Sequence, residues 1–125
     1  MSYDIRFKKG GQTCRLPFQA PRGGTYCADP GFDEAWLNMT YNYCETLSRL
    51  GIAVYGHEDD PKGTYVLNGR KAGEIAVKLA EAIPQLKDDR DPDYWKATEG
   101  NVKKALTDLL TMAVNVPPDA VCEAN

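Results

Sequence analysis

The sequence has few of the residues that metal sites and common catalytic sites require. It contains a single histidine, no Gly-x-Ser-x-Gly stretch and no Cys-x-x-Cys pair. Zinc sites and Cys–His nucleophile pairs depend on such residues at short, regular spacings. We therefore expect no metal, no cofactor and no catalytic residue. The cysteines are expected to be reduced and to serve packing; they are Cys14, Cys27, Cys44 and Cys122.

Long hydrophobic runs and a large charge of one sign are also missing. No stretch approaches the roughly 20 apolar residues of a membrane span. The first nine residues alternate polar and apolar types, unlike a secretory signal. The net charge is −3, and Lys and Arg do not cluster, so the chain is a poor candidate for binding nucleic acid. These features predict a cytoplasmic protein without membrane association.

The residues that are present predict one globular domain over residues 1–125. The chain is 42% hydrophobic and 26% charged, as in ordinary soluble domains. Residues 2–9 alternate as a strand does, Gly10 and Gly11 make a turn, and residues 13–18 alternate again. This pattern predicts an N-terminal hairpin.

The stretch AWLNMTYNY, residues 35–43, is the centre of the predicted fold. With a period of two, its odd-numbered residues are apolar or aromatic, and its even-numbered ones are Trp, Asn and Thr. We predict a core strand to about Asn42, followed by a short helix that ends at Gly51. Residues 52–55, IAVY, form either a small strand or a core-filling segment.

Two longer helices are predicted late in the chain. Apolar residues recur at helical spacing over residues 69–83, with Asn68 as the expected cap, and over residues 99–114, with Thr98 as the cap. A charged connection joins these helices, and the tail from residue 119 is expected to be short and polar. The fold class is therefore α+β: a small antiparallel sheet of three or four strands packed against these two helices.

The polar face of the core strand is the candidate ligand site. Flat rings there and in the charged connection could stack on a nucleobase, amide and hydroxyl groups could bind its edges, and cations near a helix N-terminus could meet phosphate. The alternative is that the rings pack in the core and the amides bond neighbouring strands. The candidate residues are Trp36, Asn38, Thr40, Tyr41, Asn42, Tyr43, Arg70, Lys71 and Trp95.

Three separated blocks carry a resemblance. MSYDIRF, WLNMTYNY and DYWKATEGN followed by ALTDLL are similar to a group of small phage and prophage proteins of about this length. The resemblance spans nearly the whole chain. It implies an accessory protein that works in the cytoplasm of a bacterial host and antagonises host defence.

Together, the residues and the resemblance predict a non-enzymatic protein that sequesters a small nucleotide-type signal at the end of the core strand. An alternative is an anti-CRISPR-like inhibitor that masks a host defence protein, with the acids of residues 58–60 and 87–93 docked on a basic surface. A small hydrolase of a nucleotide signal is a second alternative. The protein could also form a homo-oligomer, because such sites often form between subunits.

Overall fold

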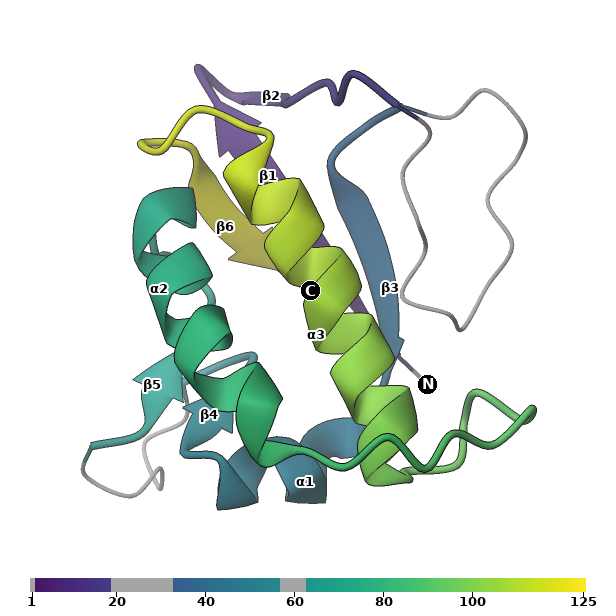
Figure 1. Ribbon diagram of the computed structural model, residues 1–125. Coiled ribbons are helices and arrows are strands. Elements are labelled where there is room, and N and C mark those ends of the chain that lie inside the picture. The colour runs from purple at the N-terminus through teal and green to yellow at the C-terminus, as the bar shows by residue number, and fades with distance from the viewer. Residues whose placement is uncertain (1, 19–32, 57–62) are drawn as a thin grey trace.

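The computed structural model describes residues 2–18, 33–56 and 63–125. A four-stranded antiparallel sheet forms one layer, and two long helices lie across one of its faces (Figure 1). A short helix and a small parallel strand pair lie at one end of this layer. The predicted α+β class is confirmed, as is the small antiparallel sheet packed against two main helices.

Strand β1 (Ser2–Lys9) is the centre of the sheet. Strand β3 (Trp36–Thr40) pairs along its first half, and β2 (Gln12–Thr13) continues on the same side, whereas β6 (Val121–Ala124) pairs on the other side. The predicted hairpin therefore exists, although its second strand is shorter than expected. Strand β6 was not predicted, because the tail was expected to be polar and outside any element.

The sheet has one buried face and one polar face, as the alternation in β1 predicts. Ile5 and Phe7 are buried against the helices, while Asp4 and Arg6, which alternate with them, are only partly covered. The buried face continues into the neighbouring strands through Leu37, Met39, Cys122 and Ala124. This period of two places the polar side chains of β3 on the face away from the helices.

Helices α2 (Ala72–Ala82) and α3 (Glu99–Val114) form the second layer. Their buried stripes repeat at helical spacing, as predicted, and pack on each other and on the sheet. The 3-10 turn η2 (Ile83–Gln85) follows α2 directly. It contains Pro84, which cannot continue an α-helix. Thr98 caps α3 as expected, since its hydroxyl accepts from the backbone N–H of Asn101 at 3.1 Å.

The cap predicted for α2 is wrong. Lys71 occupies the cap position without a side-chain bond, so the helix begins three residues later than expected. The side chain of Asn68 instead accepts from the backbone N–H of Ala124 at 3.0 Å. It therefore covers the free edge of β6, a strand that the sequence alone did not indicate.

The core strand ends earlier than predicted, at Thr40. The Thr40 hydroxyl accepts from the backbone N–H of Asn42 at 3.2 Å, which turns the chain into a 3-10 turn, η1 (Tyr41–Tyr43). Thr is a common helix cap for this reason. Helix α1 (Cys44–Arg49) follows, and Gly51, two residues beyond its end, has φ +73°, the left-handed conformation that was predicted for it.

Two smaller features complete the fold. Strands β4 (Ile52–Ala53) and β5 (Tyr65–Val66) form a parallel pair beside α1, so the brief apolar run of residues 52–55 begins as a strand. Cys122 is buried as expected, but Cys44 is exposed, which corrects the expectation that every cysteine packs. Cys27 and the acidic residues 58–60 lie outside the described residues.

Candidate functional site

The polar face of β3 is bonded to its neighbour, β1. The Trp36 indole N–H donates to the Asp4 carboxylate at 2.9 Å, and the Asn38 amide donates to Asp4 at 3.1 Å and to the Ser2 hydroxyl at 2.8 Å. The Arg6 guanidinium lies 4.9 Å from the centre of the Trp36 ring. Trp36 and Asn38, predicted as ligand groups, therefore tie two strands together.

Thr40 and Tyr41 also have structural partners. Thr40 is buried and caps the 3-10 turn, while the Tyr41 ring lies 4.4 Å from that of Tyr3. Tyr55 completes this cluster at 5.4 Å from Tyr3. Burial and, next, a hydrogen bond with the Cys44 thiol raise the pKa of Tyr3 to about 12. These rings form the edge of the core at the end of β3.

Asn42, Tyr43 and Trp95 are brought together by the fold. The Asn42 amide donates to the backbone carbonyl of Trp95 at 2.8 Å, and the Tyr43 hydroxyl donates to the carbonyl of Tyr94. Burial raises the pKa of Tyr43 to about 12, so its hydroxyl remains a donor at neutral pH. The block YNY thus holds the connection between α2 and α3, which is more than fifty residues away.

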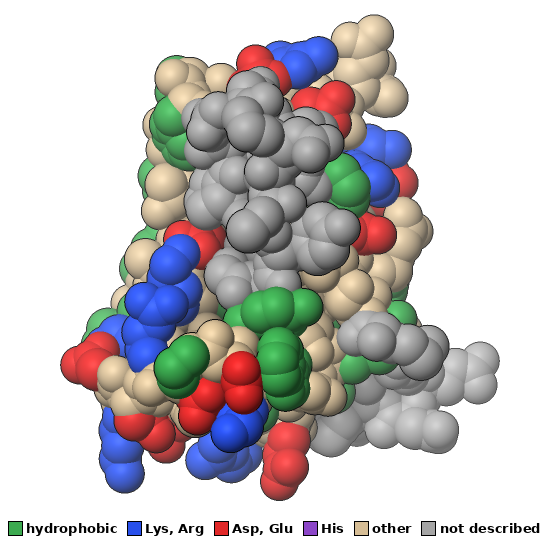
Figure 2. All heavy atoms as spheres, turned by 90° about the vertical axis from the view of Figure 1, so that its right-hand side faces the viewer, with side chains coloured by type: hydrophobic (Ala, Val, Ile, Leu, Met, Phe, Trp, Pro, Cys, Tyr) green, Lys and Arg blue, Asp and Glu red, His purple; other side chains and the backbone are tan. Residues whose placement is uncertain are grey.

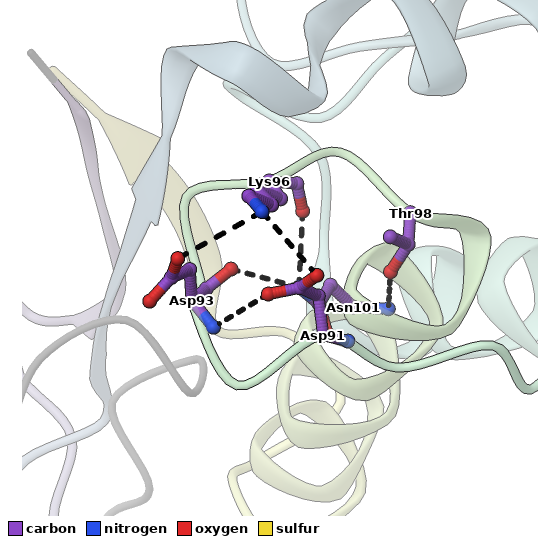
Figure 3. Close-up of polar contacts among 5 residues, drawn as sticks. All are labelled: Asp91, Asp93, Lys96, Thr98 and Asn101. Carbon is purple, nitrogen blue, oxygen red and sulfur yellow. Dashed lines mark hydrogen bonds and ion pairs between the residues drawn. The ribbon is translucent and has the colours of Figure 1, made fainter.

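Asn101, in the first turn of α3, holds the same connection from the other side (Figure 3). Its amide donates to the carbonyls of Asp93 at 3.1 Å and Lys96 at 3.0 Å, and its carbonyl oxygen accepts from the backbone N–H of Asp91 at 3.0 Å. Asn101 is buried. One side chain therefore satisfies three backbone groups, as buried polar groups require.

The carboxylates of the connection add local bonds. Asp91 accepts from the backbone N–H of Asp93 at 2.9 Å, which closes a tight turn. The Lys96 ammonium lies 3.6 Å from Asp91 and 3.9 Å from Asp93 (Figure 3). These are exposed pairs, and such pairs contribute little to stability by themselves.

Gly100 brings the connection against α3. The Gly100 backbone N–H donates to the Asp89 carboxylate at 3.2 Å. A Cβ at this position would lie 2.6 Å from the carbonyl carbon of Asp89 and 2.7 Å from the backbone nitrogen of Arg90. Only glycine allows the two backbones to approach so closely.

We call residues 87–98 the aromatic loop, because its fixed backbone presents two aromatic side chains. The carbonyls of residues 93, 94, 95 and 96 all accept hydrogen bonds from side chains outside the loop. Tyr94 and Trp95 remain 37% and 49% exposed, with ring centres 5.2 Å apart in an edge-on contact. Figure 2 shows hydrophobic, acidic and basic side chains side by side on the lower part of this face.

A small hollow lies between the aromatic loop and α3. Its volume is about 80 Å³, and its lining includes Tyr43, Arg90 and Lys104. Lys104 pairs with Asp108 one turn further along α3. The hollow is a shallow feature beside the exposed rings, well below the roughly 300–1,000 Å³ of usual ligand pockets.

Arg70 and Lys71 lie apart from the other candidates. The backbone at Arg70 accepts from Cys122 at 2.8 Å on the outer edge of β6. Strands β6 and β1 therefore separate this segment from β3, a distance of about 14 Å at the usual strand spacing. The Arg70 guanidinium lies 4.2 Å from the centre of the Tyr65 ring, while Lys71 occupies the N-cap position of α2. The predicted site thus divides into three places.

The sequence interpretation missed Asn101 and Gly100. Asn101 continues the buried stripe of α3, and a polar residue on a buried stripe signals that a specific partner exists. The partner itself is not visible in the sequence, because it is the backbone of a loop.

The described ranges of the chain contain no group of three or more His, Cys, Asp or Glu side chains that could hold a metal ion. Over the same ranges, no helix has both the length and the apolar character to cross a membrane. Comparisons with protein-family models, with curated proteins and with solved structures found no match for this chain.

Proposed function

We propose that this is a non-catalytic binding protein whose aromatic loop docks on a partner protein. The observation that carries the proposal is the contrast within the loop: four consecutive carbonyls are held by outside side chains while the Tyr94 and Trp95 rings are left exposed. Burying two large rings in a core would stabilise the fold far more. Their exposure on a fixed backbone is typical of a contact surface.

A fixed loop favours tight binding because less order has to be created on association. Immobilising flexible side chains and loops consumes part of the interaction energy of every complex. Here the backbone bonds from Asn42, Tyr43 and Asn101 have already ordered the loop in the free protein. Trp, Tyr and Arg are also the residues that dominate protein–protein binding energy, and the exposed Arg90 lines the same hollow as Tyr94.

The shape of the site favours a protein over a nucleotide. The rings are partly exposed, and the hollow that Tyr94 lines has a volume of about 80 Å³, which is smaller than a nucleotide needs for enclosure. Around the rings the loop carries exposed charges of both signs, Asp89, Arg90 and Lys96 among them, which suits a partner with charged groups around an apolar patch. Sequestration of a nucleotide signal, or its hydrolysis, stays a prediction of the sequence.

The phage resemblance supplies the proposed setting. In a bacterial host, the partner would be a host defence protein, and binding would mask the surface that this protein uses. This part of the proposal rests on the three sequence blocks, which adjoin one another in the fold: SYDIRF of the first block lies in β1 and pairs with β3 of the second block, and YNY bonds to DYW through Asn42 and Tyr43.

The test compares three forms of the protein immobilised for capture from a bacterial lysate: wild type, Trp95→Ala and Val114→Ala. Val114 is the control because it is a 61% exposed hydrophobic residue at the far end of α3. We expect one host protein on the wild type and the control, and its loss from Trp95→Ala. With the purified partner, Trp95→Ala should weaken binding by about 30-fold, as for a central aromatic contact.

Equal capture by all three forms would overturn the proposal. A panel of linear and cyclic nucleotides, tested by thermal unfolding, separates the two predicted ligand classes. A ligand at about one hundred times its dissociation constant stabilises a protein by ~2.7 kcal/mol. A shift with one nucleotide, together with no captured protein, would replace docking by sequestration.

A further inference from the structure

The outward side of α2 forms a second surface, remote from the aromatic loop. Glu74, Val77, Lys78 and Glu81 recur there at the spacing of one helix face, opposite the buried stripe. With Tyr65 of β5 and Arg70 they line a groove of about 550 Å³, which we call the α2 groove. In Figure 1, α2 and β5 lie on the side opposite β3 and the aromatic loop.

The charged side chains that line the α2 groove do not form ion pairs with each other. Within the described part of the chain, none of Arg70, Glu74, Lys78 and Glu81 forms an ion pair. The two cations instead lie near the Tyr65 ring, Arg70 at 4.2 Å and Lys78 at 5.6 Å from its centre.

Two further groups of the groove have no complement among the described residues. The Tyr65 hydroxyl is buried and has no hydrogen-bond partner there. Val77 is 63% exposed, the most exposed large hydrophobic residue of this part of the chain. Charges without ion-pair partners around an exposed apolar side chain are typical of a contact surface.

The order of the charges along α2 identifies the occupant of this surface. Positions 74 and 78, which both line the groove, are symmetrical about residue 76. They combine an acid and a lysine, Glu74 and Lys78. When two copies of α2 lie antiparallel about a two-fold axis at residue 76, Glu74 of each copy therefore faces Lys78 of the other.

We propose that the α2 groove binds the α2 groove of a second copy of this chain, in an antiparallel two-fold dimer. Such an isologous interface needs a self-complementary surface, and the charge order of α2 provides one. The Val77 side chains of the two copies lie next to the axis. A parallel alignment in register would place each charge against its own kind, so the pattern selects the antiparallel arrangement.

The contact along α2 is short, because eleven helical residues span only about 16 Å. We therefore expect a reversible dimer, measured by sedimentation velocity from about 1 µM to about 1 mM. The wild type should pass from monomer to dimer within this range. Lys78→Glu and Glu74→Lys should each weaken self-association by about tenfold or more, because like charges then meet twice.

Mixing the two charge-reversed variants gives the decisive result. In a mixed dimer, Glu74 of one copy faces the unchanged Lys78 of the other, and the two reversed residues face each other with opposite charges. The mixture should therefore dimerise about as strongly as the wild type, although neither variant does alone. Glu45→Lys, an exposed acid of α1, is the matched control and should leave dimerisation unchanged.

Three outcomes would overturn the proposal: a wild type that stays monomeric up to the highest concentration, single variants that dimerise like the wild type, or a mixture that stays monomeric. Circular dichroism of each variant confirms that it is folded. The Trp95→Ala form should dimerise normally, so that failure of this inference and failure of loop docking are separate results.

Discussion

Asparagine amides and aromatic rings occur together both at the polar face of β3 and around the aromatic loop, but the amides have different partners in the two places. In β3, Asn38 and Trp36 donate to side chains of the neighbouring strand, so these donors are already hydrogen-bonded within the sheet. At the loop, Asn42 and Asn101 donate from neighbouring elements to backbone carbonyls, and the aromatic side chains stay partly exposed. Amides that bond to a backbone fix its course and leave the neighbouring side chains exposed, as in the aromatic loop. Amides that bond to side chains leave fewer polar groups on the surface for a ligand, as in β3.

The largest effect that tests this comparison is expected from Asn101→Ala. The substitution leaves three backbone groups of the loop without their bonds, and each net bond contributes about 0.5–1.5 kcal/mol. We expect the free energy of unfolding in urea to fall by about 3 kcal/mol. Asn115→Ala is the matched control, since the exposed Asn115 bonds only within its own helix turn. Similar losses for both variants would contradict the role given to Asn101.

Gly100→Ala should have the next largest effect. The new Cβ would lie 2.6 Å from the backbone of Asp89, so the loop must move away from α3. Overpacking of this kind costs about 1–3 kcal/mol, despite the better helix propensity of alanine. In Gly73→Ala the nearest atom is 3.4 Å away, an ordinary contact. Thermal unfolding should show a lower midpoint for the first variant and an equal or higher one for the second.

Tyr43→Phe removes the hydroxyl that bonds to the loop and should cost about 1 kcal/mol at neutral pH. Burial raises the pKa of Tyr43 to about 12, above the ordinary value near 10 for an unfolded chain. The folded protein then holds its proton where the unfolded chain loses it. The stabilisation is full below pH 10 and is lost as the pH rises towards 12.

The measurement for Tyr43 is the free energy of unfolding in urea between pH 9 and 12. The wild type should lose stability with a steeper slope than Tyr43→Phe, by up to about 1.4 kcal/mol per pH unit. Tyr3, whose pKa is also raised to about 12, contributes equally in both proteins and serves as an internal control. Parallel slopes would show that Tyr43 ionises freely.

The smallest effects, and the sharpest comparison, come from Asn42→Ala and Asn38→Ala. Each removes one partly exposed amide, so each should lower stability by about 1 kcal/mol or less. Hydrogen exchange should separate them by location: faster exchange in residues 92–97 for Asn42→Ala, and faster exchange in β1 and β3 for Asn38→Ala. Loop exchange that responds equally to both variants would remove the distinction between the two regions.

Local patterns in the sequence were sufficient for most of the fold. Period two identified β1 and the buried residues Leu37 and Met39, and helical spacing identified α2 and α3. Strand β6 could not be predicted in this way. Its four residues form a strand because β1 offers them a free edge, a partner far away in the sequence.

The site was predicted less well, for the same physical reason. Asn42, Tyr43 and Trp95 were predicted as ligand-binding residues; in the structure Asn42 bonds to the backbone of Trp95 and Tyr43 to that of Tyr94, across fifty-three and fifty-one positions of sequence. Donor and acceptor types are visible in a sequence, whereas the choice between a ligand and a distant backbone carbonyl is made by the tertiary fold. Gly100 illustrates the same limit, since its role depends on the approach of Asp89.

The way in which the aromatic loop is held has a consequence for its variation. Every bond that the side chains of Asn42, Tyr43 and Asn101 make to the loop ends on its main chain, which is chemically the same for nearly all residue types. The side chains at positions 94 and 95 can therefore be exchanged without disturbing the frame that carries them. A lineage that needed a new partner could change these two residues alone, and a library randomised at the same positions would sample new specificities on an unchanged scaffold.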